Sequence, residues 1–426
     1  MSALDTLKAV GMMPADILLP QEGTDMQRWA VIACDQYTSQ SDYWEKAEEF
    51  VGGAPSALRL IIPEVYLESE KGRALQESTV REMGEYLTDG ILRTLPQSFI
   101  YVERITPYAP MRRGLVAAFD LDKYDFTPGN SMPIRATEGT ILKRLPPRMA
   151  VRRQAELELP HIMILIDDPD GTVIEPLGAV KHTLEQAYDT DLMLGAGHVA
   201  GWRVHGEPEL ARIAAALTAL NKPGAMLFAV GDGNHSLATA KACWEEIKPS
   251  LSEAERENHP ARWALAELVN VHDAGLEFHP IHRVVFGADA AGLIAALLWE
   301  MNKRGWAASM GAEPTCAQSI EYVCEGSTGY LNIGNPMCPL AAGSLQQALD
   351  AVLEGMPEAS IDYVHGDEAA EALGRQPGNT AFLLGVMDKA ELFPAVERMG
   401  VLPRKAFSMG EADEKRFYME CRRIRV

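Results

Sequence analysis

The chain has 426 residues, 47% of them apolar and 23% charged, which is enough for two or three globular domains and does not indicate disorder. Its formal net charge of -21 repels nucleic-acid phosphates and anionic membranes, so we expect no DNA and no membrane partner. The six cysteines show neither a CxxC pair nor a regular spacing, which argues against a disulfide framework or a zinc site. The first twenty residues lack the features of a secretory signal and no apolar run reaches about 18 residues, so we expect a cytoplasmic protein.

Helices and strands are predicted to alternate along the chain, without internal repeats or low-complexity tracts. Up to residue 125 we predict a strand over 29–34, helices from near Ser41 and within 70–94, and strands within 98–122. Residues 125–133 are rich in Gly, Pro and Asn, which indicates a loop between modules. From there to residue 246 we predict a basic helix-like stretch after Thr140, strands over 161–166, 172–177, 198–204 and 225–230, and helices over 209–220 and 236–246.

The last part of the chain continues the alternation. A strand over 276–280 leads into 281–286, helices follow over 290–303 and 345–354, and four strands are predicted in the segments EYVC, GYLNI, IDYVH and TAFLLGV. The mixture predicts an α+β (mixed α/β) fold in three parts. These are an N-terminal α/β segment over 1–125, a core over 126–290 and a C-terminal α+β segment over 291–426.

Six small or polar residues follow directly after the apolar strand predicted at 225–230. They are Gly231, Asp232, Gly233, Asn234, His235 and Ser236. The glycines allow positive φ and close backbone approach, and free amides at the start of the next helix can hold an anion. Asp232 would lie at the carboxyl end of the strand, where open α/β sheets bind ligands. A capped helix with a satisfied histidine is the alternative, but polar crowding directly behind a buried strand favours a small-molecule site.

Several motifs resemble those of a known family. Residues Asp232 to Ala240 resemble the DGHHR…A signature of the ParB/sulfiredoxin superfamily, and more closely a broad bacterial and archaeal family, a domain of unknown function, that carries it. Arg135–Thr140 resembles that family's R-H-E-x-T motif and Leu276–Arg283 its P-x-H-R motif, and the C-terminal segment LPRKAFSMGEADEKRFY also resembles the family. The resemblance extends through most of the chain and implies a ParB/sulfiredoxin-like core over 126–290.

The superfamily includes sulfiredoxins, partition proteins that hydrolyse CTP, and kinases that phosphorylate free serine, so the resemblance implies Mg²⁺ and a nucleotide as cofactors. It also implies that Glu138 acts as base, that Asp232 orients substrate or metal, and that His235 and the adjacent amides hold phosphate. The implied substrate and phosphate contacts are Arg135, Thr140, Gly231, Gly233, Asn234, Ser236, His282 and Arg283. A solvated loop carboxylate is an equally good account of Glu138, and a strand-end pair an equally good account of His282 and Arg283.

The chain departs from the signature at two positions. Asn234 replaces the first His, and Ser236 replaces the Arg that contacts nucleotide phosphate in the sulfiredoxin and partition branches. Ser236 can cap the helix and hydrogen-bond an anion, but it supplies no positive charge. The charge must then come from elsewhere, or the donor is not a nucleotide; the candidates are Arg135, Lys143, Arg283 and Lys405. A sulfiredoxin activity is excluded because no cysteine lies in the signature.

Other polar residues have structural explanations that compete with a role in a site. Asp167 and Asp168 could hold Mg²⁺, but the run DDPDG is also typical of a hairpin turn, which we favour. Asp35 and Tyr37 follow the strand over 29–34 and are candidates for the pocket lining, although we favour a place outside it. For three C-terminal basic residues we favour a solvated face: Lys405, Lys415 and Arg416. Neither a Rossmann GxGxxG unit nor a P-loop is present.

Two functions fit these observations. The first is a small-molecule phosphotransferase of the free-serine-kinase type, or a phosphate-ester hydrolase, acting on a hydroxylated metabolite. The second is a non-catalytic regulator that binds a nucleotide or metabolite and has a protein as its partner. We favour the enzyme, without identifying its substrate; an assembly of identical subunits stays open. In either case we expect the signature turn, Glu138 and His282 to converge on one pocket.

The net charge generates a testable prediction about nucleic acid. In a gel-shift assay at about 150 mM salt we expect no complex with duplex DNA, because few phosphates can be neutralised against a charge of -21. Any complex at low salt should dissociate steeply as salt is raised. Tight binding that resists salt would contradict the prediction.

Overall fold

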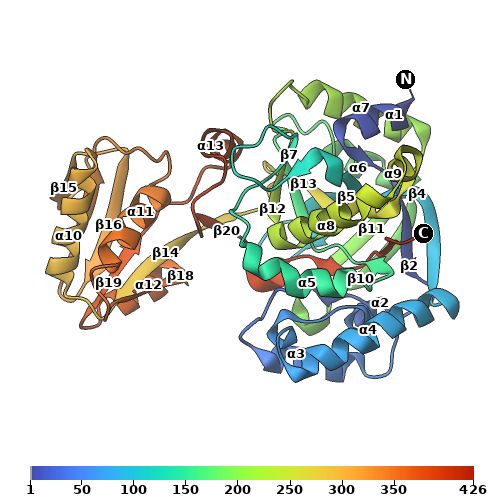
Figure 1. Ribbon diagram of the computed structural model, residues 1–426, viewed down its shortest axis with the longest axis horizontal. Helices are drawn as coiled ribbons and strands as arrows, with labels where there is room; N and C mark the ends of the chain where they lie inside the picture. The colour runs from blue at the N-terminus through green and yellow to red at the C-terminus, as the bar shows by residue number, and fades with distance from the viewer. Residues whose placement is uncertain (1) are drawn as a thin grey trace. The chain divides into compact units, whose positions relative to one another are not determined.

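The computed structural model describes residues 2–426 and divides into two compact units. The first unit extends to Glu277 and includes Glu411–Val426, and the second is Phe278–Gly410 (Figure 1). The mixed α/β fold class is confirmed, but this division differs from the three predicted segments. The reason is strand pairing across both expected boundaries: β5 (Arg112–Asp120) pairs with β13 (Trp263–Asn270), and β14 (Phe278–Phe286) with β18 (Ser360–His365).

The first unit is built on a mixed sheet that has eleven strands among the described residues. Nine of them follow the order β10 (Glu185–Asp191), β11 (His198–Val204), β4 (Leu92–Ile105), β5, β13, β9 (Met163–Ile166), β12 (Phe228–Asp232), β7 (Ile134–Ala136) and β6 (Tyr124–Asp125). Two more strands pair with members of this series but lie outside its linear order: β1 (Met12–Met13) pairs with β5, and β2 (Ala15–Pro20) pairs with β4. Strand β13 pairs in parallel with β9, and β12 in parallel with β7, whereas β12 and β9 are antiparallel.

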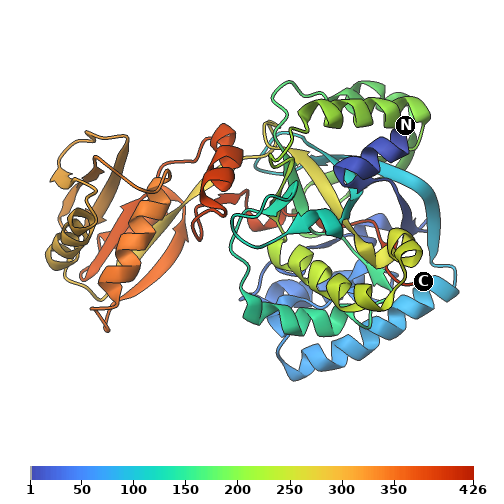
Figure 2. The same ribbon diagram turned by 45° about the horizontal axis from the view of Figure 1, so that its top comes forward.

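Helices cover the sheet on both faces, so its central strands are buried throughout. Leu265 of β13 packs into a cluster with Trp44 of α3 (Ser41–Val51), while Leu268 of the same strand packs into a second cluster with Trp244 of α8 (Asn234–Ile247). In Figures 1 and 2, α5 and α8 lie side by side. The helices are α1 (Ala3–Val10), α2 (Met26–Trp29), α3 (Ser41–Val51), α4 (Glu70–Thr88), α5 (Leu145–Arg152), α6 (Glu175–Val180), α7 (Glu207–Leu220), α8 (Asn234–Ile247) and α9 (Glu253–Asn258).

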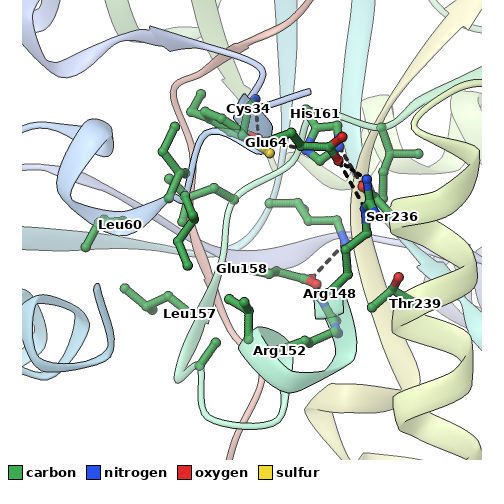
Figure 3. Close-up of a pocket in the computed structure, with 18 of the residues that line it drawn as sticks. Cys34, Leu60, Glu64, Arg148, Arg152, Leu157, Glu158, His161, Ser236 and Thr239 are labelled. Carbon is green, nitrogen blue, oxygen red and sulfur yellow. Dashed lines mark hydrogen bonds and ion pairs between the residues drawn. The ribbon is translucent and has the colours of Figure 1, made fainter. Parts of the chain in front are cut away.

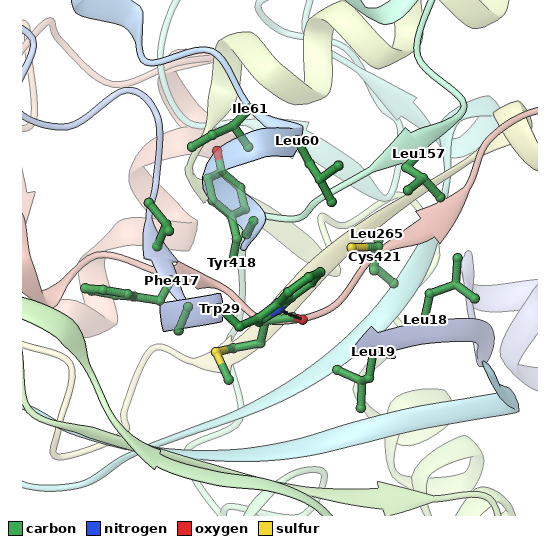
Figure 4. Close-up of a cluster of buried hydrophobic side chains, with 14 of the residues drawn as sticks. Leu18, Leu19, Trp29, Leu60, Ile61, Leu157, Leu265, Phe417, Tyr418 and Cys421 are labelled. Atoms are coloured by element: carbon green, nitrogen blue, oxygen red, sulfur yellow. Dashed lines mark hydrogen bonds between the residues drawn. The ribbon is translucent and has the colours of Figure 1, made fainter. Parts of the chain in front are cut away.

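The C-terminal segment returns to the first unit and is fixed there by short strands and buried side chains. Strand β21 (Phe417–Tyr418) pairs with β3 (Val31–Ile32), and β22 (Arg422–Arg423) pairs with β8 (Leu157–Glu158). The indole of Trp29 donates to the Met419 carbonyl at 2.8 Å inside the cluster shown in Figure 4. The segment is therefore part of the core of the first unit.

The second unit is an antiparallel sheet with helices. Its strands follow the order β15 (Ala308–Gly311), β17 (Ser327–Ile333), β16 (Gln318–Cys324), β19 (Asn379–Leu383), β14 and β18, and β20 (Phe407–Met409) pairs with β14. Its helices are α10 (Ala290–Lys303), α11 (Ala341–Leu353), α12 (Asp367–Gly374) and α13 (Leu392–Met399). A small core of Val284, Val323, Ala370 and Ala381 lies between α12 and this sheet.

Most of the predicted elements are present, and two are wrong. The strand predicted over 172–177 is instead the start of helix α6, where Pro176 occupies the first turn, a position that suits proline. The strand predicted over 29–34 is reduced to β3, because α2 occupies its first residue. Helix α3 begins at Ser41 as predicted.

Arg416 makes a testable contribution to stability. Its guanidinium, only 4% exposed, is paired with Glu267 of β13 and with Glu420, and donates to the Pro160 carbonyl at 2.9 Å. We expect Arg416→Met to lower the free energy of unfolding by roughly 3 kcal/mol or more, since it leaves two buried carboxylates without their partner. Urea unfolding measures the change in the free energy of unfolding. The matched control is Arg423→Met, because the Arg423 side chain is exposed. Equal effects of the two variants would contradict the prediction.

Candidate active site

The turn after β12 holds the signature residues at the edge of a buried strand. Gly233 has φ of 75°, and an added Cβ would lie 3.0 Å from Ile162, so only glycine fits this position without strain. Helix α8 starts at Asn234 with no side-chain cap. The Gly233 carbonyl accepts from the amides of Ser236 at 2.9 Å and Leu237 at 3.0 Å.

Two backbone donors remain at this helix start. Across residues 2–426, no hydrogen bond uses the amides of Asn234 or His235. Close by, the side-chain oxygens Oδ1 of Asn234 and Oγ1 of Thr140 are buried and have no hydrogen-bond partner in the described chain. Buried polar groups are normally satisfied, so this group of unpartnered atoms indicates a place for a polar ligand.

Asp232 and Lys415 form an ion pair beside this turn. Lys415 Nζ lies 3.2 Å from Asp232 Oδ2, with 15% and 28% of the two side chains exposed. Burial alone would raise the pKa of Asp232, but the charge of Lys415 and the Gly233 amide, which donates to Oδ1 at 2.8 Å, outweigh it and lower the pKa. Asp232 therefore stays ionised. Lys415 brings the positive charge that Ser236 does not supply, and the expectation of a solvated face for Lys415 and Arg416 was wrong because both side chains are mostly buried.

Ser236 belongs to a chain of hydrogen bonds that the sequence did not reveal. Its Oγ lies 2.7 Å from His161 Nε2, and His161 Nδ1 lies 2.8 Å from the Tyr418 hydroxyl. The Tyr418 oxygen also accepts the Cys34 amide at 3.1 Å. Ser236 is thereby linked through His161 to Tyr418 and to the backbone at Cys34. The only sequence signals were the position of His161 at the start of a predicted strand and the place of Tyr418 in the C-terminal motif.

The segment with Glu138 lies against the signature turn. Strands β7 and β12 are parallel, with Ala136 opposite Val230, so both strands present their carboxyl ends at the same edge. Thr137 Oγ1 donates to the Val230 carbonyl at 2.6 Å, and the Ile141 amide donates to His235 Nε2 at 3.3 Å. The structure thus brings the segment from Glu138, which is exposed, to Thr140, which is half-buried, to the turn.

His235 is held as a neutral ring. Burial lowers its pKa, and the charges of Arg144 and Arg148 lower it further. Because Nε2 accepts the Ile141 amide, the ring proton lies on Nδ1, where it is a neutral donor. Positive charge near the turn therefore comes from Lys415, Arg144 and Arg148 rather than from His235.

Other predicted residues lie elsewhere or have structural partners. Arg135 donates to the carbonyls of Met132 at 2.7 Å and Gly224 at 3.0 Å, which fixes two loops. Lys143 is exposed on the segment before α5, and Lys405 is exposed in the second unit.

His282 and Arg283 belong to β14 of the second unit and have partners there. His282 accepts the Leu384 amide at 3.1 Å and pairs with Asp367 at 2.8 Å. Arg283 donates to the Arg404 carbonyl at 2.9 Å. Both lie in the middle of β14 rather than at a strand end, and both have structural partners; their convergence with Glu138 stays a prediction.

The acidic run after β9 forms a turn. Asp168 accepts from the amides of Thr172 at 2.6 Å and Val173 at 2.8 Å, and Asp167 pairs with His272 at 2.7 Å. Within residues 2–426, no three His, Cys, Asp or Glu side chains are grouped to hold a metal ion.

Of the two residues after β3, one lies near the site. Asp35 Oδ2 is 3.9 Å from His161 Nε2, whereas Tyr37 stacks on Tyr43 with 3.9 Å between ring centres.

A cavity of about 170 Å³ opens beside Ser236 and His161 (Figure 3). Glu64 and Arg148, joined by a hydrogen bond of 3.0 Å from Arg148 Nε, lie near its polar end. Cys34, Arg152, Glu158, Thr239 and Tyr418 also line the cavity, together with eleven aliphatic side chains: Leu60, Ile61, Ile62, Leu67, Met83, Val151, Ala155, Leu157, Leu159, Ile162 and Leu265.

The lowered pKa of His235 predicts a pH dependence of stability. When pH falls through about 6.5, the unfolded chain gains a proton on this ring before the folded chain does, so the free energy of unfolding should decrease. His235→Gln lacks this contribution, and the stability of the wild type relative to the variant should shrink between pH 8 and pH 5. Urea titrations test this, with exposed His205→Gln as control. A relative stability that grows on acidification would contradict it.

None of the described helices has the length and apolar content needed to cross a membrane.

No curated protein matches the chain. Among solved structures, a mutant of free serine kinase in complex with ADP is 10% identical, covers 73% of this chain and 92% of that chain, and has a TM-score of 0.40. Free serine kinase in complex with AMP is 11% identical, with 73% and 91% covered and a TM-score of 0.39. A conserved hypothetical protein from Pyrococcus furiosus is 11% identical, with 73% and 95% covered and a TM-score of 0.36.

The family model described as protein of unknown function (DUF1015) matches residues 18–352. This match covers the signature turn, the Glu138 segment and the His282 motif, and it confirms the family resemblance expected from them. Since it extends over most of the chain, this protein belongs to the DUF1015 family.

Proposed function

We propose that this protein is a small-molecule phosphotransferase that binds a phosphoryl group at the start of α8 and transfers it to a hydroxylated metabolite. The observation that carries the proposal is the pair of unpartnered amides at Asn234 and His235, next to the partly buried Lys415–Asp232 ion pair. A helix start with free amides binds anions, and a neighbouring ammonium group adds charge. The protein's charge of -21 would otherwise repel a phosphorylated substrate, so a local positive site is needed.

Each residue of the turn has a proposed role. Lys415 and the two amides hold phosphate oxygens, and the Ser236 hydroxyl, oriented by His161, donates a further hydrogen bond. Asp232 holds the Lys415 ammonium in place. Such preorganised donors stabilise charge that develops on a transferring phosphoryl group.

The transfer step requires an acceptor and a base. The hydroxyl oxygen of the acceptor bonds to phosphorus, the bond from phosphorus to the donor's oxygen breaks, and the acceptor's proton passes to Glu138. Glu138 suits this role because it is exposed and follows β7 at the edge where β12 ends at Asp232. With water as acceptor, the same step is hydrolysis of a phosphate ester.

A nucleotide is the proposed source of the phosphoryl group, and its phosphates would accept hydrogen bonds from the free amides at the turn. Mg²⁺ is usually held by one or two carboxylates together with substrate phosphates, so the lack of a three-residue cluster in the described chain is compatible with it. Asp232 lies two residues before the first of the two amides and would be its protein ligand. When bound, Mg²⁺ would offset the charge of the phosphates.

Replacing Asp232 tests the proposal. We expect Asp232→Asn to reduce phosphate transfer by about 100-fold or more, since it removes the charge that holds Lys415, while the melting temperature changes by only about 3 °C. Lys415→Met should reduce phosphate transfer by a similar factor. Transfer from a nucleoside triphosphate with Mg²⁺ to a panel of hydroxylated metabolites, followed by phosphorus NMR, measures it.

Asp168→Asn is the matched control. It removes a carboxylate that accepts turn amides, so we expect about 1–2 kcal/mol lower stability with turnover retained. Wild-type turnover in Asp232→Asn would refute the proposed role. Nucleotide binding without turnover against the whole panel would instead support the non-catalytic regulator.

A further inference from the structure

The pocket beside the turn opens to solvent and extends inward to the main core cluster. Its volume is about 170 Å³, and its lining includes Leu60, Leu157 and Leu265, which are 2%, 1% and 1% exposed. An apolar cavity of roughly 150 Å³ accepts a benzene-sized molecule.

The two ends of the cavity differ in chemistry. Figure 3 shows His161, Glu64 and Ser236 grouped at one end, with Leu60 and Leu157 away from them. Ser236 is the fourth residue after Asp232 and lies in the first turn of α8, so the polar end borders the proposed phosphoryl site. A ligand placed here would direct an apolar group inward and a hydroxyl toward Ser236.

On the basis of the proposed function, we infer that the acceptor substrate carries a compact apolar group, a branched alkyl or a single ring, which this cavity binds. The apolar group contributes affinity by burial, and the hydroxyl is thereby positioned beside the phosphoryl group. The acceptor class is therefore an amphipathic alcohol rather than a small polar one such as a free hydroxy amino acid.

A nucleobase is the competing occupant, and the lining disfavours it. Bases bind by stacking on aromatic faces and by hydrogen bonds to their edges. Among the described lining residues, Tyr418 is the one Phe, Tyr or Trp, and its hydroxyl is engaged with His161 and Cys34. Glu158 and Arg152 pair with one another at 2.6 Å, which occupies two of the polar groups that a base edge would need.

The test uses a series of straight-chain alcohols from ethanol to octanol, cyclohexanol and their phosphate monoesters, with binding measured by calorimetry and ligand NMR. We expect affinity to rise roughly fourfold per methylene and to level off near six carbons, where the cavity is full. The alcohols contain no phosphate, so their binding does not depend on the proposed phosphoryl site.

A variant that fills the cavity tests whether the alcohols bind there. Leu159 lines the cavity and is half-buried, so Leu159→Trp should remove the dependence on chain length while the protein stays folded. Half-buried Leu220 of α7 packs against the other core cluster, and Leu220→Trp is the matched control. If Leu159→Trp does not fold, Val151→Phe on α5 fills the same cavity.

The outcomes separate this inference from the proposed function. The inference is overturned if the affinity of the wild type for the alcohols does not depend on chain length. It is also overturned if the affinity depends on chain length equally in Leu159→Trp and Leu220→Trp. Loss of AMP binding in Leu159→Trp with ribose 5-phosphate binding unchanged also overturns it, because the cavity would then hold a base. Alcohol binding that follows the expected series, in a protein that neither binds inorganic phosphate nor transfers phosphate, supports the cavity and refutes the proposed function.

Discussion

The buried ion pair between Arg416 and Glu267 is the constraint on which the candidate site depends. Glu267 lies in β13, a central strand of the first unit, and Arg416 comes from the far end of the chain. An ionised pair at 2% and 4% exposure is tolerated only when further hydrogen bonds satisfy it, and the Pro160 carbonyl and Glu420 do so here. This pair fixes the position of the residues on either side of Arg416.

Those flanking residues complete the site. Lys415 reaches Asp232, and Tyr418 reaches His161, which in turn holds Ser236. The signature turn alone offers amides and a carboxylate, but no positive charge. A segment that is distant in sequence and rigidly held in the core supplies that charge, and a site supported in this way is better preorganised than one on a free loop.

The sequence predicted the local part of this arrangement and missed the long-range part. Six apolar residues followed by Gly231 to Ser236 were sufficient to predict the strand, the turn and the helix, because these depend on neighbours in sequence. Lys415 and His161 lie 183 and 71 residues from Asp232, and no periodicity connects them with it. The second unit was missed for the same reason. Its strands β14 and β18 pair with each other, but they lie on opposite sides of the boundary predicted at residue 290.

The replacement of the signature's arginine by Ser236 can now be given a physical reason. Ser236 Oγ lies 2.7 Å from His161 Nε2, so the larger side chain of an arginine at this position would compete with the histidine for space. His161 is in turn fixed by Tyr418, which belongs to the same C-terminal segment as Lys415. The chain thus combines the His161–Tyr418 pair with an ammonium group at position 415. Because the charge is a lysine paired with Asp232, its strength depends on that carboxylate staying ionised, which its lowered pKa ensures at neutral pH.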